Sequence, residues 1–516
     1  MKLNLAINTI FTLISKLTTI TVGIFTTRYL VMGLDSNQYG FYVFLWSVSS
    51  ALFFTDMGMG IAAQKKTGEY ESHGDINKLN KEINTIFVTY LLILALFFII
   101  NYFLITPSLQ NFLIIDTKEH PINFYQNLFW IFSNLIAVNF TISFFREILV
   151  GLRKIYVIEI INAISNIVYL GIIIAFFKLK LDLEFIIWAV PLNQTLIFII
   201  FIFLAIYSIK GLRINPFLFS IKTLRSILSF SLHAYSQAVI TIIQKNVNHV
   251  ILGTVLGTVY VGFYQIATKL QEVVKMLNDF YQSNIMPATT YLVSSNRINE
   301  LRSFILNSNK FVFFIGMLSL FPFFMLVEPL MWIWLKVDNP EIVLVARILV
   351  IEMFLRNIFS SVNTRYLLMS GKEKTCTKFA VMEFSLNIIL SYLALTFFDM
   401  PSMAAARVLI TFGVNLFGIM RTTGEQLKVT LKDYYCHCCK RTLIFSLIPL
   451  SFLTIFCHSI DLVEWSLLKF ATISISYGAI FAIIGVYYIL EDGDKKIVVK
   501  KFPKLKILFP KLKLDS

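Results

Sequence analysis

Long stretches without a single charged residue constrain this chain more than any other feature. Three of them cover residues 83–115, 160–177 and 185–209. A helix needs about 17–25 mainly apolar residues to cross the hydrocarbon core of a bilayer, so each stretch is long enough to span a membrane. With 57% apolar and 15% charged residues over 516 positions, the sequence predicts an all-α polytopic membrane protein.

The hydropathy pattern predicts about fourteen transmembrane helices joined by short polar connections. The predicted spans are 4–31, 37–63, 83–106, 122–150, 155–177, 185–209, 226–252, 258–288, 308–328, 342–370, 376–398, 402–422, 441–459 and 465–490. An even number of spans places both termini on the same side of the membrane.

Lysine and arginine are distributed asymmetrically over the predicted connections. Thirty of them fall in the two terminal tails and six alternate loops, whereas the other connections hold only Lys118, Lys178, Lys180 and Lys336. Cytoplasmic loops of membrane proteins carry such an excess of basic residues, so we expect both termini in the cytoplasm. Basic loops lying along anionic lipids explain the net charge of +15, and no nucleic-acid partner is expected.

Short motifs recur at a nearly constant distance along the chain. They are Gly40-Phe41-Tyr42 with Gly262-Phe263-Tyr264, Ile76-Asn77 with Ile298-Asn299, and Gly151 with Gly371. Six predicted spans per copy give both copies the same orientation, which is the parallel-repeat organisation of some secondary transporters. We expect an N-terminal six-helix lobe at 1–210, a C-terminal six-helix lobe at 211–425, two additional helices within 426–490 and a basic cytoplasmic tail at 491–516.

Several further motifs occur in a characteristic order over roughly residues 1–425. They are Tyr39-Gly40-Phe41-Tyr42, Thr55-Asp56-Met57-Gly58-Met59-Gly60, Gly68-Glu69-Tyr70, Gly262-Phe263-Tyr264 with Lys269, and Leu330-Met331-Trp332-Ile333-Trp334. In this order they resemble the signatures of polysaccharide repeat-unit flippases, the Wzx-type O-antigen transporters.

This resemblance implies the fold of the multidrug/oligosaccharidyl-lipid/polysaccharide exporter superfamily, with two six-helix lobes facing a central cavity and two C-terminal helices. It also implies flipping of an undecaprenyl-diphosphate-linked oligosaccharide across the bacterial cytoplasmic (inner) membrane, for O-antigen, capsule or exopolysaccharide synthesis. The expected partners are this substrate, anionic membrane lipids, a polysaccharide polymerase and a chain-length regulator.

Ionisable residues at membrane depth are costly unless they face water or each other, so they point to a transport path. In the predicted eighth span, Lys269, Glu272, Lys275 and Asp279 share an arc of about 120° on one helix face. One hypothesis is that the two lysines attract the diphosphate while Glu272 or Asp279 takes part in ion coupling. The alternative is a structural ladder, because opposite charges have i,i+3 and i,i+4 spacing.

The remaining candidates lie in other spans. Lys245 and His249 are one turn apart in the seventh span, where His249 is either proton-sensitive or an ordinary satisfied polar residue. Lys16 lies near the middle of the first span, and Arg28 near its end is either a phosphate contact or snorkels to headgroups. Asp56 lies about 10 Å inside the second span, where it is a candidate for ion coupling or for pinning helix packing.

Two further patterns of charge are given structural interpretations. Glu352 and Arg356 have the acid-first i,i+4 order of a self-paired salt bridge. Arg347 and Arg407 lie nearer the ends of their predicted spans, so their long side chains are expected to snorkel toward the headgroups.

Enzyme motifs are absent from the sequence, which has no GxxxxGK[ST] loop, no HExxH and no GxSxG. We therefore expect no catalytic residues and no cofactor, and we expect an ion gradient to drive transport. The neighbouring Cys436, His437, Cys438 and Cys439 cannot readily converge on one ion, so no metal site is expected.

Two alternative functions remain open. A drug/cation antiporter of the same superfamily would have about twelve spans and a more acidic passage, which the lysines of the eighth span oppose. A membrane polysaccharide polymerase or glycosyltransferase would carry a large outer loop, whereas the longest predicted outer connection, 106–121, is short.

Overall fold

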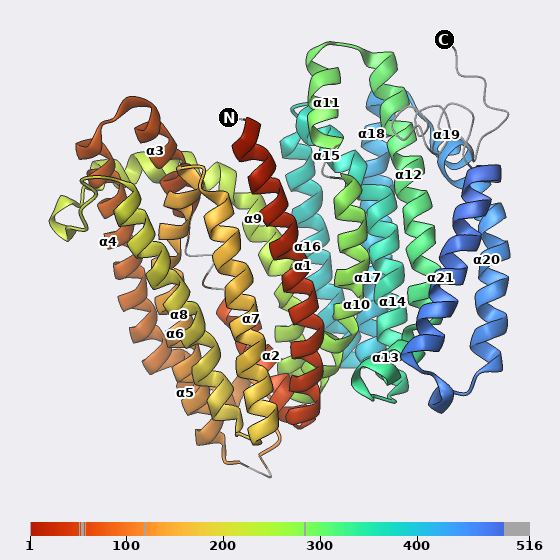
Figure 1. The fold of residues 1–516 in the computed structure, drawn as a ribbon, viewed down its shortest axis with the longest axis horizontal. Coiled ribbons are helices and arrows are strands. Elements are labelled where there is room, and N and C mark those ends of the chain that lie inside the picture. Colours follow the sequence, from red (N-terminus) through yellow and green to blue (C-terminus); the bar gives the residue numbers. More distant parts are fainter. Residues whose placement is uncertain are drawn as a thin grey trace. The chain divides into compact units, whose positions relative to one another are not determined.

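Every regular element in the described part of the chain is a helix (Figure 1). The computed structural model describes residues 2–50, 52, 56, 58–117, 120–282 and 285–489. The description does not extend to the side chains at 2–10, 72–73, 112, 229–243, 245, 273–274, 276–282, 287, 463 and 489. Two units, residues 1–263 and 264–516, divide the chain, and the division falls within one helix. The all-α polytopic architecture expected from the sequence is confirmed, while the lobe boundary at 210 stays a prediction.

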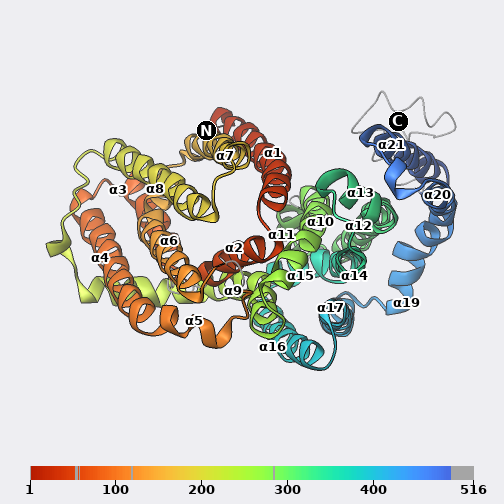
Figure 2. The same cartoon turned by 90° about the horizontal axis from the view of Figure 1, so that it is seen from below.

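The first unit holds the helices up to the beginning of α10. They are α1 (Lys2–Gly33), α2 (Ser36–Ser49), α3 (Met59–His73), α4 (Ile76–Ile100), η2 (Asn101–Ile105), α5 (Thr106–Phe112), α6 (Ile122–Gly151), α7 (Ile155–Leu179), α8 (Leu183–Ser208), η3 (Pro216–Leu218), α9 (Ile221–Val255) and α10 (Thr258–Gln282). Seen along the helix axes, α1 lies beside α7 (Figure 2).

The second unit holds the rest of α10 and all later helices. These are α11 (Ile285–Ser294), α12 (Ile298–Met325), α13 (Val327–Leu335), α14 (Pro340–Arg356), η4 (Asn357–Ser361), α15 (Val362–Met369), α16 (Glu373–Phe397), α17 (Met400–Val414), η5 (Asn415–Met420), α18 (Arg421–Leu427), α19 (Leu431–Tyr434), η6 (Tyr435–Cys439), α20 (Lys440–Ser459), η7 (Leu462–Glu464), α21 (Leu467–Ile484) and η8 (Gly485–Ile489).

Nine helical runs among the described residues are long and apolar enough to cross a membrane. They are Ile76–Asn111, Ile122–Gly151, Ile155–Leu179, Leu183–Ser208, Ile298–Met325, Glu373–Phe397, Met400–Leu427, Leu431–Ser459 and Leu467–Tyr488. The other five predicted spans fall on α1, α2–α3, α9, α10–α11 and α14–α15. Most of the candidate site residues lie on these five segments.

The second predicted span is not one continuous helix. Residues 37–63 were expected to form a single span, but α2 ends at Ser49 and α3 begins at Met59. Gly58, which immediately precedes α3, has a left-handed backbone with φ of 76°, and this conformation interrupts a right-handed helix. In the second half the corresponding span holds α10 and α11, and residues 283 and 284 between them lie outside the described residues. Discontinuous helices such as α2–α3 form binding sites in secondary transporters.

Helix contacts within each unit follow the internal repeat. In the first unit α6 contacts α8, α4 contacts α6 and α3 contacts α6. In the second unit the corresponding contacts are α14 with α17, α12 with α14 and α11 with α15. The second, third, fourth and sixth spans of the two halves therefore make equivalent contacts, as a parallel repeat requires.

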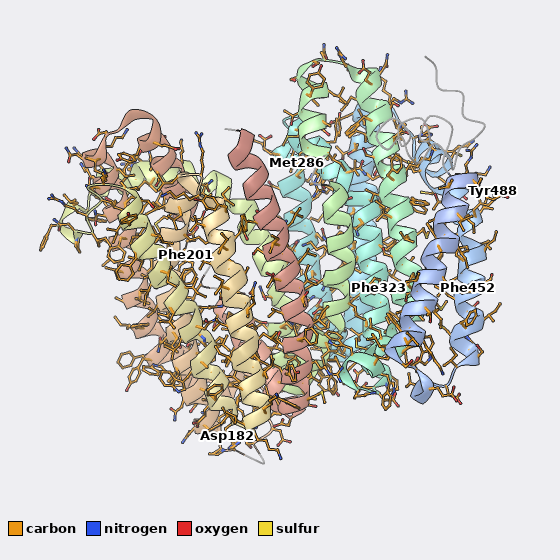
Figure 3. The ribbon with its side chains drawn as sticks, viewed as in Figure 1. Asp182, Phe201, Met286, Phe323, Phe452 and Tyr488 are labelled. Carbon is orange, nitrogen blue, oxygen red and sulfur yellow. The ribbon has the colours of Figure 1, made fainter. Side chains whose placement is uncertain are left out.

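Connections of the first unit that carry several basic residues lie at one of its ends (Figure 1). The beginning of α1, the α3–α4 turn and the α8–α9 connection lie at this end, while Asp182 in the α7–α8 turn lies at the opposite end (Figures 1 and 3). This placement agrees with the predicted threading through the membrane. Which end faces the cytoplasm stays a prediction.

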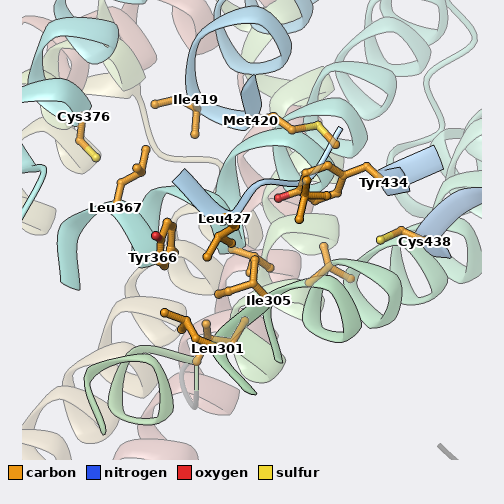
Figure 4. Packing of buried hydrophobic residues seen from close by; sticks show 14 residues of the cluster. Leu301, Ile305, Tyr366, Leu367, Cys376, Ile419, Met420, Leu427, Tyr434 and Cys438 are labelled. Atoms are coloured by element: carbon orange, nitrogen blue, oxygen red, sulfur yellow. The ribbon is translucent and has the colours of Figure 1, made fainter. Parts of the chain in front are cut away.

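A buried apolar cluster holds the helices of the second unit together at one end. Leu301 and Ile305 of α12 pack with Tyr366 and Leu367 of α15 and with Leu427 of α18 (Figure 4). Close packing in membranes depends on van der Waals contact, because lipid is as apolar as the side chains it surrounds. This cluster therefore fixes α12, α15 and α18 as one body.

The two copies of the Gly-Phe-Tyr motif meet in the first unit. A Cβ atom added at Gly40 of α2 would lie 1.7 Å from the carbonyl oxygen of Thr258 at the start of α10, and one at Gly262 would lie 3.0 Å from a ring carbon of Tyr39. The side chain of Asn37 accepts a hydrogen bond from the Thr258 hydroxyl. The repeated glycines thus let α2 and α10 cross in backbone contact. Gly40, Thr258 and Gly262 are referred to below as the glycine crossing.

Candidate functional site

A buried polar site in the second unit surrounds Glu352 of α14, whose side chain is 0% exposed. Its Oε1 accepts hydrogen bonds from Arg356 Nε at 2.9 Å and Nη2 at 2.7 Å, and from Thr411 Oγ1 of α17 at 2.8 Å. Its Oε2 accepts from Gln271 Nε2 of α10 and lies 3.7 Å from Arg407 Nη2 of α17. These donors explain how a carboxylate is tolerated at a depth where an isolated charge would be costly.

The two arginines extend this site to further side chains. Arg356 Nη2 donates to Glu383 Oε1 of α16 at 2.5 Å, and Arg407 Nη1 donates to the Tyr264 hydroxyl of α10 at 2.5 Å. Two carboxylates and two guanidinium groups have no net formal charge. The set is referred to as the Glu352 network, and its residues are Tyr264, Gln271, Glu352, Arg356, Glu383, Arg407 and Thr411. It joins four helices, α10, α14, α16 and α17, through charge-assisted hydrogen bonds.

The structure confirms one expectation for these charges and overturns another. Glu352 and Arg356 form the predicted i,i+4 salt bridge. The expectation that Arg407 snorkels is wrong, because its side chain is only 17% exposed and bonds to Tyr264 and Glu352. A buried carboxylate within reach is a better partner than distant headgroups. Arg347 Nη2 lies 3.2 Å from Oε2 of Glu328 in α13, and snorkelling by Arg347 stays a prediction.

The charged face of α10 combines a paired and an exposed lysine. Lys269 Nζ lies 3.0 Å from Glu272 Oε2, and their side chains are 29% and 41% exposed. Lys275, six residues farther along the helix, is exposed, and the side chain of Asp279 lies outside the described residues. The Lys269–Glu272 pair is the contact that the structural-ladder interpretation requires. Contact of either lysine with substrate stays a prediction.

Each unit holds part of the candidate set. In the first unit Lys16 of α1 is exposed, Arg28 is half-buried and His249 of α9 is 5% exposed. The side chain of Lys245 lies outside the described residues. The roles expected for these four residues stay predictions.

Asp56 lies between α2 and α3 and caps the beginning of α3. Its Oδ2 accepts a hydrogen bond from Gly58 N at 3.1 Å, and its Oδ1 accepts from Gly60 N at 3.4 Å and from the Tyr90 hydroxyl of α4. A carboxylate at this position satisfies N–H groups that have no partner inside the helix. These contacts match the helix-pinning alternative, and ion coupling by Asp56 stays a prediction.

The family model of the polysaccharide biosynthesis proteins matches residues 5–293 of this chain. The chain belongs to this family. A search of curated proteins gives no match.

Solved structures show which fold this polysaccharide biosynthesis protein has. A structure described as "Lipid II flippase MurJ, inward closed conformation" is similar with a TM-score of 0.69 and 17% identity, covering 92% of this chain and 98% of the flippase. An inward-facing multidrug-resistance MATE family transporter of the MOP superfamily has a TM-score of 0.63 and 14% identity, covering 79% and 94%. A MOP superfamily transporter from Pyrococcus furiosus has a TM-score of 0.54 and 13% identity, covering 83% and 96%. These likenesses confirm the superfamily fold expected from the sequence.

A second charged cluster in this polysaccharide biosynthesis protein joins α3 to α4. Lys66 Nζ lies 3.1 Å from Glu69 Oε2 and 3.2 Å from Glu82 Oε1, beside a cavity of about 250 Å³. Burial disfavours the charged form of Lys66, but the two carboxylates outweigh it and raise the pKa of the ammonium group. For Glu69, burial is likewise outweighed by the Lys66 ammonium, which lowers the pKa of the carboxyl. Both groups are therefore charged near neutral pH, as ion pairs between helices require.

Sequence reasoning missed four members of the Glu352 network. Glu383 lies inside the predicted span 376–398, so an intramembrane carboxylate was the signal that could have identified it. Tyr264, Gln271 and Thr411 are uncharged, and polar residues of these types are common in membrane helices. Among the described residues, no group of three His, Cys, Asp or Glu side chains is placed to hold a metal ion.

Replacing Asp56 separates its capping role from ion coupling. Asp56→Asn keeps one of the two acceptor oxygens and removes the charge, so we expect it to lose less stability than the alanine variant. Asp56→Ala removes the acceptor and is expected to cost about 1–2 kcal/mol. Thermal unfolding in detergent measures the first role, and transport under an imposed ion gradient measures the second. An asparagine variant that is stable but uncoupled would assign ion coupling to the carboxylate.

Proposed function

We propose that this protein flips undecaprenyl-diphosphate-linked oligosaccharide repeat units from the cytoplasmic to the outer leaflet of the bacterial cytoplasmic membrane. The products would supply O-antigen, capsule or exopolysaccharide synthesis. The match of residues 5–293 to polysaccharide biosynthesis proteins is the observation that carries the proposal, and the fold shared with a lipid II flippase supports it. A sugar diphosphate cannot cross about 30 Å of hydrocarbon unaided, so its movement needs a polar path.

The proposed path contacts the diphosphate through cationic side chains. Lys275 is exposed on α10, and Lys269 lies on the same helix with Glu272 beside it. A lysine ammonium group attracts phosphate as a compact point charge. Lys16, Arg28, Lys245 and His249 are proposed as further contacts from α1 and α9.

Transport is proposed to use an ion gradient and alternating access. Asp56, Glu272 and Asp279 are the proposed coupling groups, because carboxylates at membrane depth bind a proton or a cation. The break between α2 and α3 supports alternating access, because discontinuous helices form the substrate and ion sites of secondary transporters. Dissipation of the gradient is expected to abolish net accumulation of substrate in the outer leaflet.

Reconstitution tests the proposed activity directly. The full chain is placed in vesicles with a fluorescent undecaprenyl-diphosphate oligosaccharide, and the sidedness of the label is followed with an impermeant quencher. We expect movement that depends on the protein and that fails for a phospholipid carrying the same label. Equal movement of both lipids would show a nonspecific scramblase and would overturn the proposal.

Lys275 provides the sharpest single-residue test of the path. Lys275→Ala is expected to reduce the flipping rate by a factor of about 10 to 100, because a hydrogen bond to a charged group contributes about 1.5–3 kcal/mol. Lys275→Arg keeps the charge and should restore most of the rate. Lys178→Ala, at the opposite end of the first unit from α3, is the matched control for loss of a lysine. A Lys275→Ala rate equal to that of the control would remove this residue from the path.

The fold also supports a second candidate, a drug/cation antiporter, because MATE transporters share it. The same vesicles distinguish the two functions. Cation-dependent uptake of a hydrophobic organic cation, without movement of the oligosaccharide lipid, would favour the antiporter.

A further inference from the structure

The connection between α8 and α9, residues 209–220, is bound to α4 through its backbone. Asn80 Nδ2 donates to the Gly211 carbonyl at 2.9 Å, and its Oδ1 accepts from Arg213 N at 2.9 Å. Asn84 Nδ2 donates to the Arg213 carbonyl at 2.7 Å, and its Oδ1 accepts from Asn215 N at 2.6 Å. Two buried asparagines thus pair with alternate residues, as a neighbouring strand would. The connection is therefore seated in a defined course on α4.

A hollow of about 800 Å³ lies between this connection and the beginning of α4. Its lining includes two basic side chains, Lys81 and Arg213, and the amides of Asn77 and Asn215. No carboxylate is among the residues that line it. The hollow therefore favours a ligand with negative charge and several hydrogen-bond acceptors.

The position of the hollow along α4 places it at the level of lipid headgroups. Lys81 comes two residues before Ile83, where the uncharged run of this span begins. At about 1.5 Å per residue along the helix axis, Lys81 lies about 3 Å from the beginning of that apolar run. A basic site at this depth meets phospholipid phosphates rather than bulk solvent.

Exposed apolar side chains lie on the hollow and next to its lining residues in the chain. Phe217 lines the hollow and is 96% exposed, while Ile214 and Ile221, which adjoin lining residues in the sequence, are 39% and 67% exposed. Large apolar groups next to basic residues are the composition of interfacial segments, which bury apolar side chains below the headgroups. A soluble anion would leave these side chains in water, whereas a lipid covers them.

We propose that this hollow binds one anionic phospholipid, with its phosphate against Lys81 and Arg213 and its acyl chains against Phe217 and Ile221. Predicted threading places the lipid in the inner leaflet. The Asn80 and Asn84 contacts hold the backbone of Arg213 against α4, which carries Lys81, before the lipid arrives. This site shares no residue with the Glu352 network or with the proposed flipping path, so its test does not need the transported substrate.

Binding is tested with the full chain in detergent, using dioctanoyl phosphatidylglycerol as the probe. Dioctanoyl phosphatidylcholine and inorganic phosphate are the comparison ligands. We expect the phosphatidylglycerol Kd to rise about fivefold for Lys81→Ala or Arg213→Ala and about 25-fold for the double variant. Lys210→Ala is the matched control, because Lys210 is an exposed neighbour that does not line the hollow. Phe217→Ser should also weaken the lipid, without changing any charge.

Each result decides the proposal. A selective loss in the double variant, with an unchanged Lys210→Ala control and unchanged thermal midpoints without lipid, supports the site. An equal loss in Lys210→Ala would indicate a diffuse basic surface and would overturn it. Inorganic phosphate that competes at the same concentration as phosphatidylglycerol would assign the hollow to a soluble anion instead. None of these outcomes depends on flipping activity.

Discussion

Glu352→Ala is expected to lower the free energy of unfolding by about 3–5 kcal/mol, the cost of leaving buried charges without their partner. The fully buried carboxylate binds Arg356 and Thr411 through Oε1 and lies 3.7 Å from Arg407 through Oε2. Its removal leaves Arg356 with Glu383 and leaves Arg407 with the neutral Tyr264. Thermal and denaturant unfolding in detergent measure the loss. Glu352→Gln keeps the size of the side chain and should lie between alanine and wild type.

A matched surface pair and a double variant identify the cause of this loss. Arg421 and Glu425 form an i,i+4 pair at 2.9 Å with both side chains more than 60% exposed, so Glu425→Ala should cost less than about 1 kcal/mol. Adding Arg407→Ala to Glu352→Ala restores equal numbers of buried positive and negative groups. We expect the double variant to lose less than the sum of the two single losses, by about 0.5–3 kcal/mol. A Glu352→Ala loss no larger than that of Glu425→Ala would show that the network contributes little to stability.

Much of the fold follows from two periodic properties of the sequence. Uncharged runs such as 185–209 set the number and approximate position of helices, since each must bury its backbone polar groups within itself. The recurrence of Gly40-Phe41-Tyr42 after 222 residues indicated the parallel repeat, and equivalent helix contacts in the two units agree with it. Hydropathy could not show that the second span is interrupted, because an apolar average hides the left-handed backbone at Gly58.

The site was less predictable, because contacts between distant helices leave no trace in local spacing. The i,i+4 rule identified Glu352 with Arg356, but it cannot bring Arg407 or Gln271 to the same carboxylate. A position near the end of a span suggested snorkelling for Arg407, whereas tertiary packing gave it a buried partner. Likewise, the sequence gives Asn80 and Asn84 no special role, and only the structure shows that they form hydrogen bonds with the backbone of residues 211–215.

A helix cap and close glycine contacts have different roles in the first unit. The carboxylate of Asp56 accepts hydrogen bonds from the Gly58 and Gly60 N–H groups, so it stabilises the beginning of α3. The glycine crossing holds two helices together, and its backbone contact leaves no side chain that can adjust. The first unit therefore combines a local helix cap with a rigid contact between the two sequence repeats.

Gly40→Ala is expected to destabilise the protein by about 3 kcal/mol or more, at the upper end of the cost of overpacking. The added Cβ would lie 1.7 Å from the Thr258 carbonyl oxygen and 3.2 Å from the Gly262 nitrogen. Neither is the flexible end of a side chain, so α2 or the beginning of α10 must shift as a whole. That shift also breaks the hydrogen bond between Asn37 and Thr258, which lies one helical turn away. Yield and the thermal midpoint in detergent measure the loss.

Gly23→Ala in α1 is the matched control, because a Cβ there meets nothing within 4 Å. Alanine favours a helix over glycine by up to about 1 kcal/mol, so this variant should be as stable as wild type or more stable. Alanine's higher helix propensity also favours the variant at Gly40, so the unfavourable contact with Thr258 must outweigh this gain for the protein to be destabilised. Gly262→Ala, with its nearest contact at 3.0 Å to a Tyr39 ring carbon, should fall between the two because the ring can move. The expected order of thermal midpoints, from highest to lowest, is Gly23→Ala, Gly262→Ala and Gly40→Ala. A different order would show that the crossing is not a rigid contact and that the repeated glycines serve helix flexibility instead.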